Sequence, residues 1–176
     1  MPLWKIRVNT TSPRKNNNNG DLQMEIYIRN SRLDEYKQIS AIMKQVQQMH
    51  IDWRPDIYKY NETVLPLEVY EQAVKDKTFF VAEYEGIIAG ILFIIYRHVE
   101  ASNLVTRNTI FVDSMAVDKD YRGKGIGHTF FDFLKELKLQ KGYDGIELQV
   151  NAKNEAAYKM YTDYGFTKKS INMELL

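Results

Sequence analysis

The chain of 176 residues carries a formal net charge of +1 and contains no cysteine. A charge so near zero argues against nucleic acid as the main partner, and the missing thiols exclude disulfides, thiolate metal ligands and a catalytic cysteine. The three histidines (His50, His98 and His128) are scattered, so we expect no metal site. The longest apolar run, residues 86–96, suits a buried strand and is too short to cross a membrane. At this length we expect a single domain, and because residues 1–5 show no secretory pattern, we expect it in the cytoplasm.

Residues 1–23 differ in composition from the rest of the chain. The run 14–20 is polar and of low complexity, and it offers too little apolar surface to order itself. A strand pattern begins only at Met24. We therefore expect a disordered or added tail at 1–23 and one domain at 24–176; a basic interaction arm is the alternative for the tail.

The domain alternates between strand and helix patterns. Ser31 and Asp34 are typical of a helix start, and Pro66 suits the first turn of a second helix. Glu85 and Gly86 predict a hairpin turn. In chain order we expect a strand at 25–29, helices at 31–49 and 66–76, strands at 78–84, 87–96 and 109–117, a helix at 125–140, a strand at 145–150, a helix at 154–164 and a strand pair within 166–176. This order predicts an α/β fold with helices on both faces of a mixed sheet.

A glycine-rich turn follows the strand at 109–117. Its three glycines (Gly123, Gly125 and Gly127) stand at every second position, so that successive backbone N–H groups can approach one anion. The helix that begins on the turn adds its partial positive charge, and Arg122 and Lys124 add full charges. The turn is therefore typical of a pyrophosphate site.

Two common nucleotide motifs do not fit this turn. A Walker A loop needs a hydroxyl after its lysine, and Lys124 is followed by Gly125. A Rossmann turn needs its first glycine directly after the strand and an acidic residue at the end of the next strand. Here residues 118–121 intervene, and the next strand ends in residues 149–151 without an acid. Taken alone, the turn could also be a plain entry into a helix.

A second motif lies downstream, Asn154-x-x-Ala-x-x-x-Tyr161-x-x-x-Gly165-Phe166. Combined with Arg122-x-x-Gly125-x-Gly127 after an apolar strand, it resembles the GCN5-related N-acetyltransferase (GNAT) superfamily across residues 110–167. The resemblance implies the acyl-CoA N-acyltransferase fold, with a mixed, mostly antiparallel sheet of six to seven strands and about four helices. It also implies acetyl-CoA as cosubstrate, with no metal.

The resemblance assigns the cosubstrate to three places. The pyrophosphate would lie on the backbone amides of 122–128, and the pantetheine arm would pair with an open strand edge at 115–117. Asn154 would bond the pantetheine amides, and Tyr158 would cover the cosubstrate. The implied set is Met115, Ala116, Val117, Arg122, Gly123, Lys124, Gly125, Ile126, Gly127, His128, Asn154 and Tyr158. A helix cap for Asn154, half-buried packing for Tyr158 and core filling for the strand side chains are the alternatives.

The implied reaction is direct attack of an amine on the thioester. Tyr161 would protonate the departing thiolate as general acid. A free amine of pKa about 10.4 is deprotonated roughly once in 2,500 molecules at pH 7, so a base is needed. Asp113 stands two residues before Met115, hence on the same face of a regular strand, and is the predicted base. His98 and Glu100 are the other candidates.

The expected loop at 50–65 is the predicted acceptor side. Trp53 and Tyr58 could hold a cationic amine by cation–π contact, with Asp52 or Asp56 neutralising it, or the aromatic residues could anchor the loop. We expect acetylation of a small amine, with no nucleic acid or membrane partner, and a homodimer is possible. Acetylation of a protein lysine or N-terminus, and a non-catalytic acetyl-CoA-binding module, are the alternatives.

Overall fold

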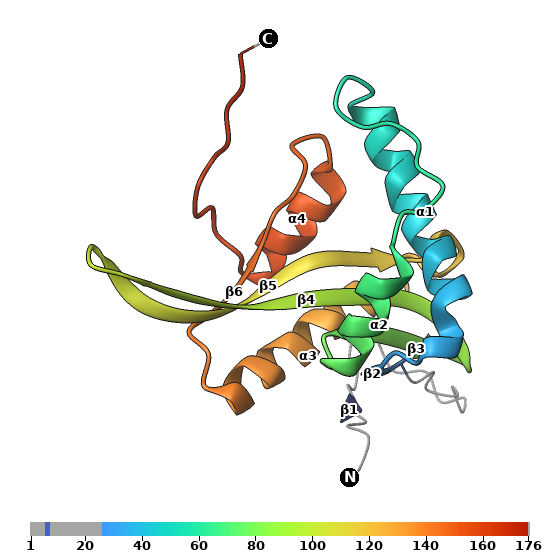
Figure 1. Cartoon of the computed structure of the whole chain (residues 1–176), viewed down its shortest axis with the longest axis horizontal. Coiled ribbons are helices and arrows are strands. Elements are labelled where there is room, and N and C mark those ends of the chain that lie inside the picture. Colours follow the sequence, from blue (N-terminus) through green and yellow to red (C-terminus); the bar gives the residue numbers. More distant parts are fainter. Residues whose placement is uncertain (1–5, 8–25, 176) are drawn as a thin grey trace, which may run out of the picture.

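The computed structural model describes residues 6–7 and 26–175. Within them, one mixed sheet carries α1 and α2 on one face and α3 on the other (Figure 1). The elements are β1 (Ile6–Arg7), β2 (Ile26–Asn30), a 3-10 turn (Leu33–Glu35), α1 (Tyr36–Trp53), α2 (Leu67–Lys75), β3 (Phe79–Tyr84), β4 (Ile87–Ala101), β5 (Leu104–Val117), a second 3-10 turn (Lys119–Tyr121), α3 (Ile126–Lys141), β6 (Gly145–Leu148) and α4 (Glu155–Tyr164).

The strands stand side by side in the order of the sequence. Every neighbouring pair is antiparallel except β5 and β6, which are parallel. This confirms the predicted α/β class and the mixed, mostly antiparallel sheet. The short strand β1 lies inside the segment predicted as a tail and pairs with β2. The rest of residues 1–23 lies outside the described residues, so the domain start at Met24 stays a prediction.

The strand pair predicted within 166–176 is wrong for the described part, because residues 166–175 form no strand. Ile171, Met173 and Leu175 alternate with polar residues as strand residues do, but they are 68%, 88% and 99% exposed. Alternation predicts a strand only where another element buries its apolar side.

The strands predicted at 87–96 and 109–117 are too short, because the polar residues 98–108 between them do not form a separate connection. β4 and β5 continue through these residues as one long hairpin that projects from the body of the molecule (Figure 1). Cross-strand pairs such as Arg97–Thr109 and Val99–Arg107 hold this arm in register. β-Branched side chains suit a strand even where polar neighbours suggest a loop.

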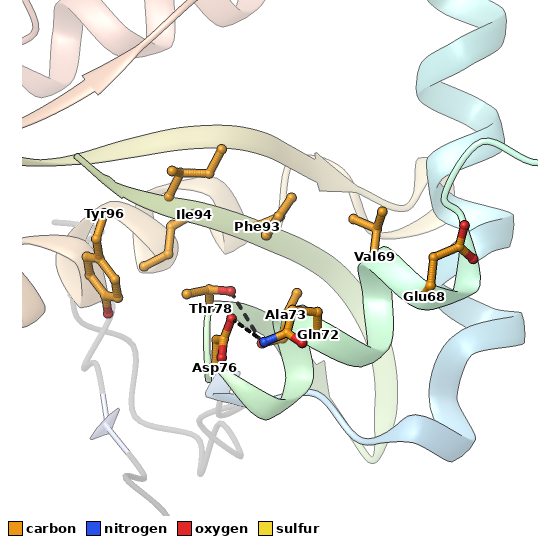
Figure 2. A pocket seen from close by; sticks show the side chains of 10 residues that line it. Glu68, Val69, Gln72, Ala73, Asp76, Thr78, Phe93, Ile94 and Tyr96 are labelled. Carbon is orange, nitrogen blue, oxygen red and sulfur yellow. Dashed lines mark hydrogen bonds between the residues drawn. The ribbon is translucent and has the colours of Figure 1, made fainter.

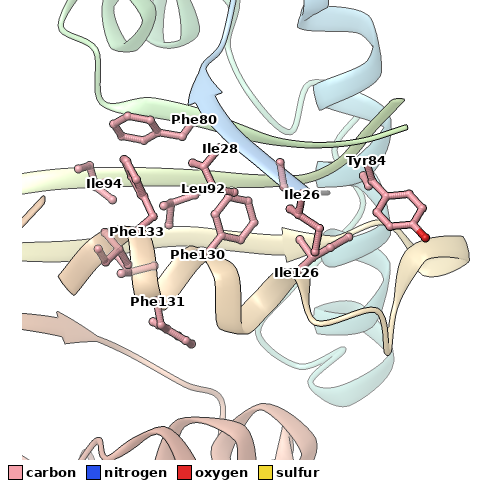
Figure 3. Close-up of a cluster of buried hydrophobic side chains, with 14 of the residues drawn as sticks. Ile26, Ile28, Phe80, Tyr84, Leu92, Ile94, Ile126, Phe130, Phe131 and Phe133 are labelled. Carbon is pink, nitrogen blue, oxygen red and sulfur yellow. The ribbon is translucent and has the colours of Figure 1, made fainter. Parts of the chain in front are cut away.

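Two apolar clusters fill the spaces on either side of the sheet. On one face Phe130 and Phe133 of α3 pack on Leu92 and Ile94 of β4 (Figure 3). On the other face Ile39 of α1 packs with residues of α2, β3 and β4. The helices cover the sheet because their apolar residues recur at spacings of three and four.

A buried ion pair closes the corner between β2 and α1. The Glu35 side chain, 5% exposed, accepts hydrogen bonds from Arg29 Nη2 at 2.6 Å and from the Arg32 backbone N–H at 2.8 Å. Arg29 also donates from Nε to Glu83 at 2.8 Å. Burial opposes the charge on Arg29, but the bonds to Glu35 and Glu83 outweigh it and raise its pKa.

We predict that Glu35→Ala lowers the free energy of unfolding by about 3–5 kcal/mol, because it removes the buried carboxylate that pairs with Arg29 and leaves the guanidinium with Glu83. Chemical denaturation measures this change. Glu71→Ala, at an exposed position on α2, is the control and should change stability by less than about 0.5 kcal/mol. Equal losses in both variants would show that the corner does not depend on the ion pair.

Candidate active site

The glycine turn has the backbone that its sequence predicts. Gly123 and Gly125 adopt left-handed φ angles of 78° and 86°, and α3 begins directly afterwards at Ile126. The first helical hydrogen bond runs from the Thr129 N–H to the Gly125 carbonyl at 3.0 Å. The N–H groups of residues 126–128 therefore lack helical acceptors and lie at the positive end of the helix dipole.

Gly127 is required for a different reason. A Cβ on this residue would lie 3.0 Å from the sulfur of Met160 in α4. The third glycine of the motif therefore allows α4 to approach the start of α3. This contact brings the glycine turn and the last helix together, as the two sequence motifs imply.

The strand that precedes the turn has an open edge. Pairing of β5 with β6 ends at Val112–Leu148, whereas pairing with β4 continues to Val117–Gly90. The Asp118 N–H donates to Ala89 at 2.9 Å, so the backbone groups of Ala116 point toward β4. Those of Met115 and Val117 alternate with it and point toward the open edge. Amides of an extended pantetheine arm can pair with such an edge.

The side chains of 115–117 are packing residues, as the sequence suggests. Met115 and Val117 lie against the cluster under α3, and Ala116 lies against the cluster under α1 and α2. Only the backbone groups of Met115 and Val117, which point toward the open edge, can therefore act on a ligand.

The two cationic side chains of the turn, Arg122 and Lys124, have different neighbours. Arg122 donates from Nε to the Val117 carbonyl at 3.3 Å and places Nη2 3.6 Å from the sulfur of Met49. Lys124 Nζ lies 5.2 Å from the centre of the Tyr84 ring. Arg122 thus covers one acceptor on the open edge rather than the turn itself. An exposed bond of this length is weak, so a ligand amide can replace it.

Tyr161 of α4, the predicted general acid, is partly buried. Its ring packs edge-on against Phe131, with centroids 5.6 Å apart, and against Phe166 at 6.0 Å. Burial raises the pKa of the Tyr161 hydroxyl, which therefore stays protonated at neutral pH. The hydroxyl makes no hydrogen bond with the part of the chain that the structure describes.

Asn154 and Tyr158 have other contacts. Asn154 caps α4, because its side-chain oxygen accepts from the Ala157 N–H at 3.2 Å. The amide nitrogen of that side chain can still donate to a ligand. Tyr158 is 40% exposed, with Lys168 Nζ 5.4 Å from its ring centre. Their roles toward the cosubstrate stay predictions.

The expected position of Asp113 is wrong. The register passes from Phe93–Ser114 to Ile94–Val112, which makes Asp113 the extra residue of a β-bulge. Val112 and Met115 both belong to the cluster under α3, although three positions separate them. Asp113 and Ser114 therefore lie on the other face from Met115. Asp113 is exposed, and the Ser114 hydroxyl donates to it at 3.1 Å. Sequence periodicity cannot reveal such a bulge.

The other two candidate bases lie far from the open edge. His98 Nδ1 is 2.8 Å from Asn108 Oδ1, and Nε2 is 3.2 Å from Glu100 Oε2. These bonds, first to Asn108 and then to Glu100, raise the pKa of His98. Asn108 and Met115 are seven residues apart on β5, about 23 Å along a strand. His98 and Glu100 therefore belong to the projecting arm.

The predicted acceptor loop is folded onto itself. The rings of Trp53 and Tyr58 lie on His50, with centroids 5.7 and 4.9 Å away. Asp52 accepts from Gln48 at 2.8 Å. These contacts fit the anchoring alternative, and the role of Trp53 and Tyr58 toward an acceptor stays a prediction.

Two contacts with residues far away in the sequence fix the position of the predicted acceptor loop, and no local sequence pattern predicts them. Lys153 Nζ donates to the Trp53 carbonyl at 3.0 Å, just before α4. Arg54 pairs with Asp56 at 2.6 Å and with Glu174 at 2.5 Å. The hydrogen bond from Arg54 holds the pKa of Asp56 below its usual value. Asp56 is thus already matched by a cation of the chain.

The described residues contain no group of three His, Asp or Glu side chains that could hold a metal ion. Among the helices that the structure places, none is long and apolar enough to cross a membrane.

Comparison with known proteins places these features in a family. The family model "Acetyltransferase (GNAT) family" matches residues 46–166. The N-acetylaspartate synthetase of Danio rerio is 29% identical over 102 residues, which are 58% of this chain and 34% of that protein. This chain therefore spans about a third of the length of that curated relative.

Solved structures show the same fold. A mutant of the BH1408 protein from Bacillus halodurans superposes with a TM-score of 0.80 at 25% identity, over 85% of this chain and 98% of that one. The aminoglycoside N-acetyltransferase AAC(6')-Iy, solved in complex with CoA, superposes with a TM-score of 0.63 at 14% identity, over 94% of this chain and 98% of that one.

We predict that Gly125→Val abolishes measurable acetyl-CoA binding in calorimetry while the protein stays folded. The substitution forces a β-branched residue into a left-handed conformation and displaces the amides that begin α3.

Gly142→Val is the matched control. Gly142 has a φ of 65° at the opposite end of the same helix, and a Cβ there would meet no atom within 4 Å. It imposes similar backbone strain and should leave the affinity unchanged. Equal affinities in the two variants would exclude the glycine turn as the anion site.

Proposed function

Because the chain belongs to the acetyltransferase (GNAT) family, we propose that it transfers the acetyl group of acetyl-CoA to the amine of a small molecule. The transfer is direct, in a complex that holds both substrates. The observation that carries the proposal is the convergence of three features: the open edge of β5, the glycine turn that follows it, and Tyr161 of α4.

The chain's own groups fit the chemical parts of acetyl-CoA. The amides of 126–128 match the pyrophosphate, and the backbone of Met115 and Val117 matches the pantetheine amides. Asn154 offers its side-chain N–H groups from the start of α4. Binding displaces the Arg122 side chain from the Val117 carbonyl and frees a cation beside the turn.

The thioester supplies the activated acetyl group. The amine first adds to the thioester carbonyl and forms a nitrogen–carbon bond, which gives a tetrahedral intermediate with an oxyanion. The intermediate then collapses with cleavage of the carbon–sulfur bond, and the leaving thiolate takes the proton of the Tyr161 hydroxyl. A thiol has a pKa of about 8.5 and a tyrosine about 10, so this transfer proceeds only as the sulfur gains charge. The Met115 N–H, on the open edge, stabilises the oxygen of the tetrahedral intermediate. The proton of the attacking amine passes to Asp113 through water, since Asp113 lies on the other face of the strand.

Two observations favour a small acceptor over a protein. The bonds from Lys153 to Trp53 and from Arg54 to Glu174 tie the acceptor loop to α4 and the C-terminal segment. An extended peptide needs an open groove at this place. The name of the Danio rerio relative also points to a small acceptor.

We propose a cytoplasmic location, and only the lack of a secretory sequence pattern supports this proposal.

Release of CoA, measured with amines, polyamines, amino acids and lysine peptides, tests the proposal. Turnover with a small amine supports it, and turnover with peptides alone would make protein acetylation the function. Binding of acetyl-CoA without turnover of any acceptor would leave the non-catalytic binding module as the better description.

We predict that Tyr161→Phe lowers kcat about 10²–10⁴-fold and leaves the KM for acetyl-CoA nearly unchanged, because the ring packing is kept and only the proton donor is lost. Steady-state kinetics with a responsive amine measure this. Tyr164→Phe is the control on the same helix: its hydroxyl donates to Asp132 at 2.6 Å, so the change should lower stability and not kcat. Wild-type turnover by Tyr161→Phe, with chemistry limiting, would make Tyr161 a packing residue.

We predict that Asp113→Asn lowers kcat at neutral pH and that the loss shrinks as the pH rises. The amide cannot accept a proton, whereas an acceptor amine of pKa about 10.4 loses its own proton at high pH. A pH profile of kcat for both forms measures this. Parallel profiles would assign the base to water or to another group.

A further inference from the structure

Part of the predicted pyrophosphate site lies outside α3. The amides of 126–128 belong to that helix, whereas those of 122–125 belong to the connecting segment, residues 118–125, which joins β5 to α3. Gly123 and Gly125 of this segment have left-handed φ angles. Because glycine has much conformational freedom to lose, such a segment needs contacts from other elements to keep one geometry.

Asp118 fixes the beginning of the connecting segment. Its N–H donates to the Ala89 carbonyl of β4 at 2.9 Å, and its carbonyl accepts from the Tyr121 N–H at 2.9 Å. Its side-chain Oδ1 accepts from the Asp120 N–H at 3.0 Å and so caps the 3-10 turn that follows. The other carboxylate oxygen, Oδ2, can therefore accept a bond from outside the segment.

Gln45 of α1 supplies that bond. Its Nε2 donates to Asp118 Oδ2 at 2.9 Å, and its Oε1 accepts from the Lys119 N–H at 3.0 Å. Gln45 and Asp118 are both half-buried, so water competes less for these bonds. A flipped amide would set oxygen against oxygen and N–H against N–H. The two bonds therefore fix the position and the direction of the first two residues of the segment.

The same face of α1 also reaches the residues directly before the glycines. Met49 follows Gln45 by four positions and therefore lies beside it on the helix surface. The Met49 sulfur is 3.6 Å from Arg122 Nη2. α1 thus lies along residues 118–122, and the predicted acceptor loop follows at the end of the same helix.

We infer that Gln45 is a positioning residue for acetyl-CoA, because its two hydrogen bonds hold the connecting segment in the geometry that presents the amides of 122–125 to the pyrophosphate. The inference rests on the proposed function, since it concerns the same cosubstrate site. A segment that is already ordered loses less conformational freedom when the ligand binds, and this raises the affinity. Gln45 acts through Asp118 and Lys119 and not by contact with the cosubstrate.

Calorimetry with acetyl-CoA and the full chain tests the inference. We expect Gln45→Ala to raise the Kd for acetyl-CoA about tenfold, because two hydrogen bonds that preorganise the site are lost. The KM for acetyl-CoA should rise by a similar factor. At saturating acetyl-CoA, kcat should stay within about twofold of the wild-type value, because Tyr161 and Met115 are unchanged.

Gln72→Ala is the matched control. Gln72 of α2 also donates from Nε2 to an aspartate, Asp76, at 2.8 Å, but this pair makes no part of the connecting segment (Figure 2). Its loss should leave the Kd unchanged. If Gln45→Ala binds acetyl-CoA as the wild type does and only melts at a lower temperature, Gln45 is a structural residue and this inference alone is overturned. A wild type that does not bind acetyl-CoA would overturn the proposed function as well.

An exchange of groups between the two partners tests the contact itself. Gln45→Glu sets a second carboxylate against Asp118 and should weaken binding more than Gln45→Ala does. Addition of Asp118→Asn restores the contact with donor and acceptor reversed. The new amide donates to the new carboxylate, whose other oxygen still accepts from the Lys119 N–H, and the amide oxygen still accepts from the Asp120 N–H. The double variant should therefore return to within about threefold of the wild-type Kd. A double variant as weak as Gln45→Glu alone would contradict the inference.

Discussion

The separation of β5 from β6 is the constraint on which the rest of the site depends. The two strands pair through Val112 and Leu148 and then part, and the bulge at Asp113 lies at this point. β5 continues with β4 and exposes the backbone of Met115 and Val117. β6 leaves toward Asn154 and the start of α4. A continuous parallel pairing would bury the edge that makes the site possible.

Packing between α3 and α4 sets how the separated parts meet. The absence of a side chain on Gly127 admits Met160, and Phe131 supports the rings of Tyr161 and Phe166. Tyr164 fastens the same two helices through its bond to Asp132. Most motif residues of the last helix therefore fix its position, whereas the Tyr161 hydroxyl has no hydrogen-bond partner among the described residues and is the proposed proton donor.

The features that the sequence predicts correctly are those set by the backbone preferences of single residues. The left-handed Gly125, the start of α3 and the stop of α4 at Gly165 follow from backbone preferences that single residues express. The bulge at Asp113 and the length of the arm depend on how two strands pair, which neither strand encodes alone. Arg54 and Glu174 form an ion pair although they are 120 residues apart in the sequence. No rule based on residue spacing predicts a contact over such a separation.

The bulge also sets where the predicted base can act. Phe93 lines the groove between α2 and β4 (Figure 2) and stands opposite Ser114, the neighbour of Asp113. Adjacent strands are about 4.8 Å apart, so the groove and the bulge lie close together on the same face of the sheet. Asp113 is exposed there, so water can reach the carboxylate to which the proposed proton transfer leads. A change that covers this face would therefore alter the surroundings of Asp113, while the glycine turn and the open edge of β5 keep their geometry.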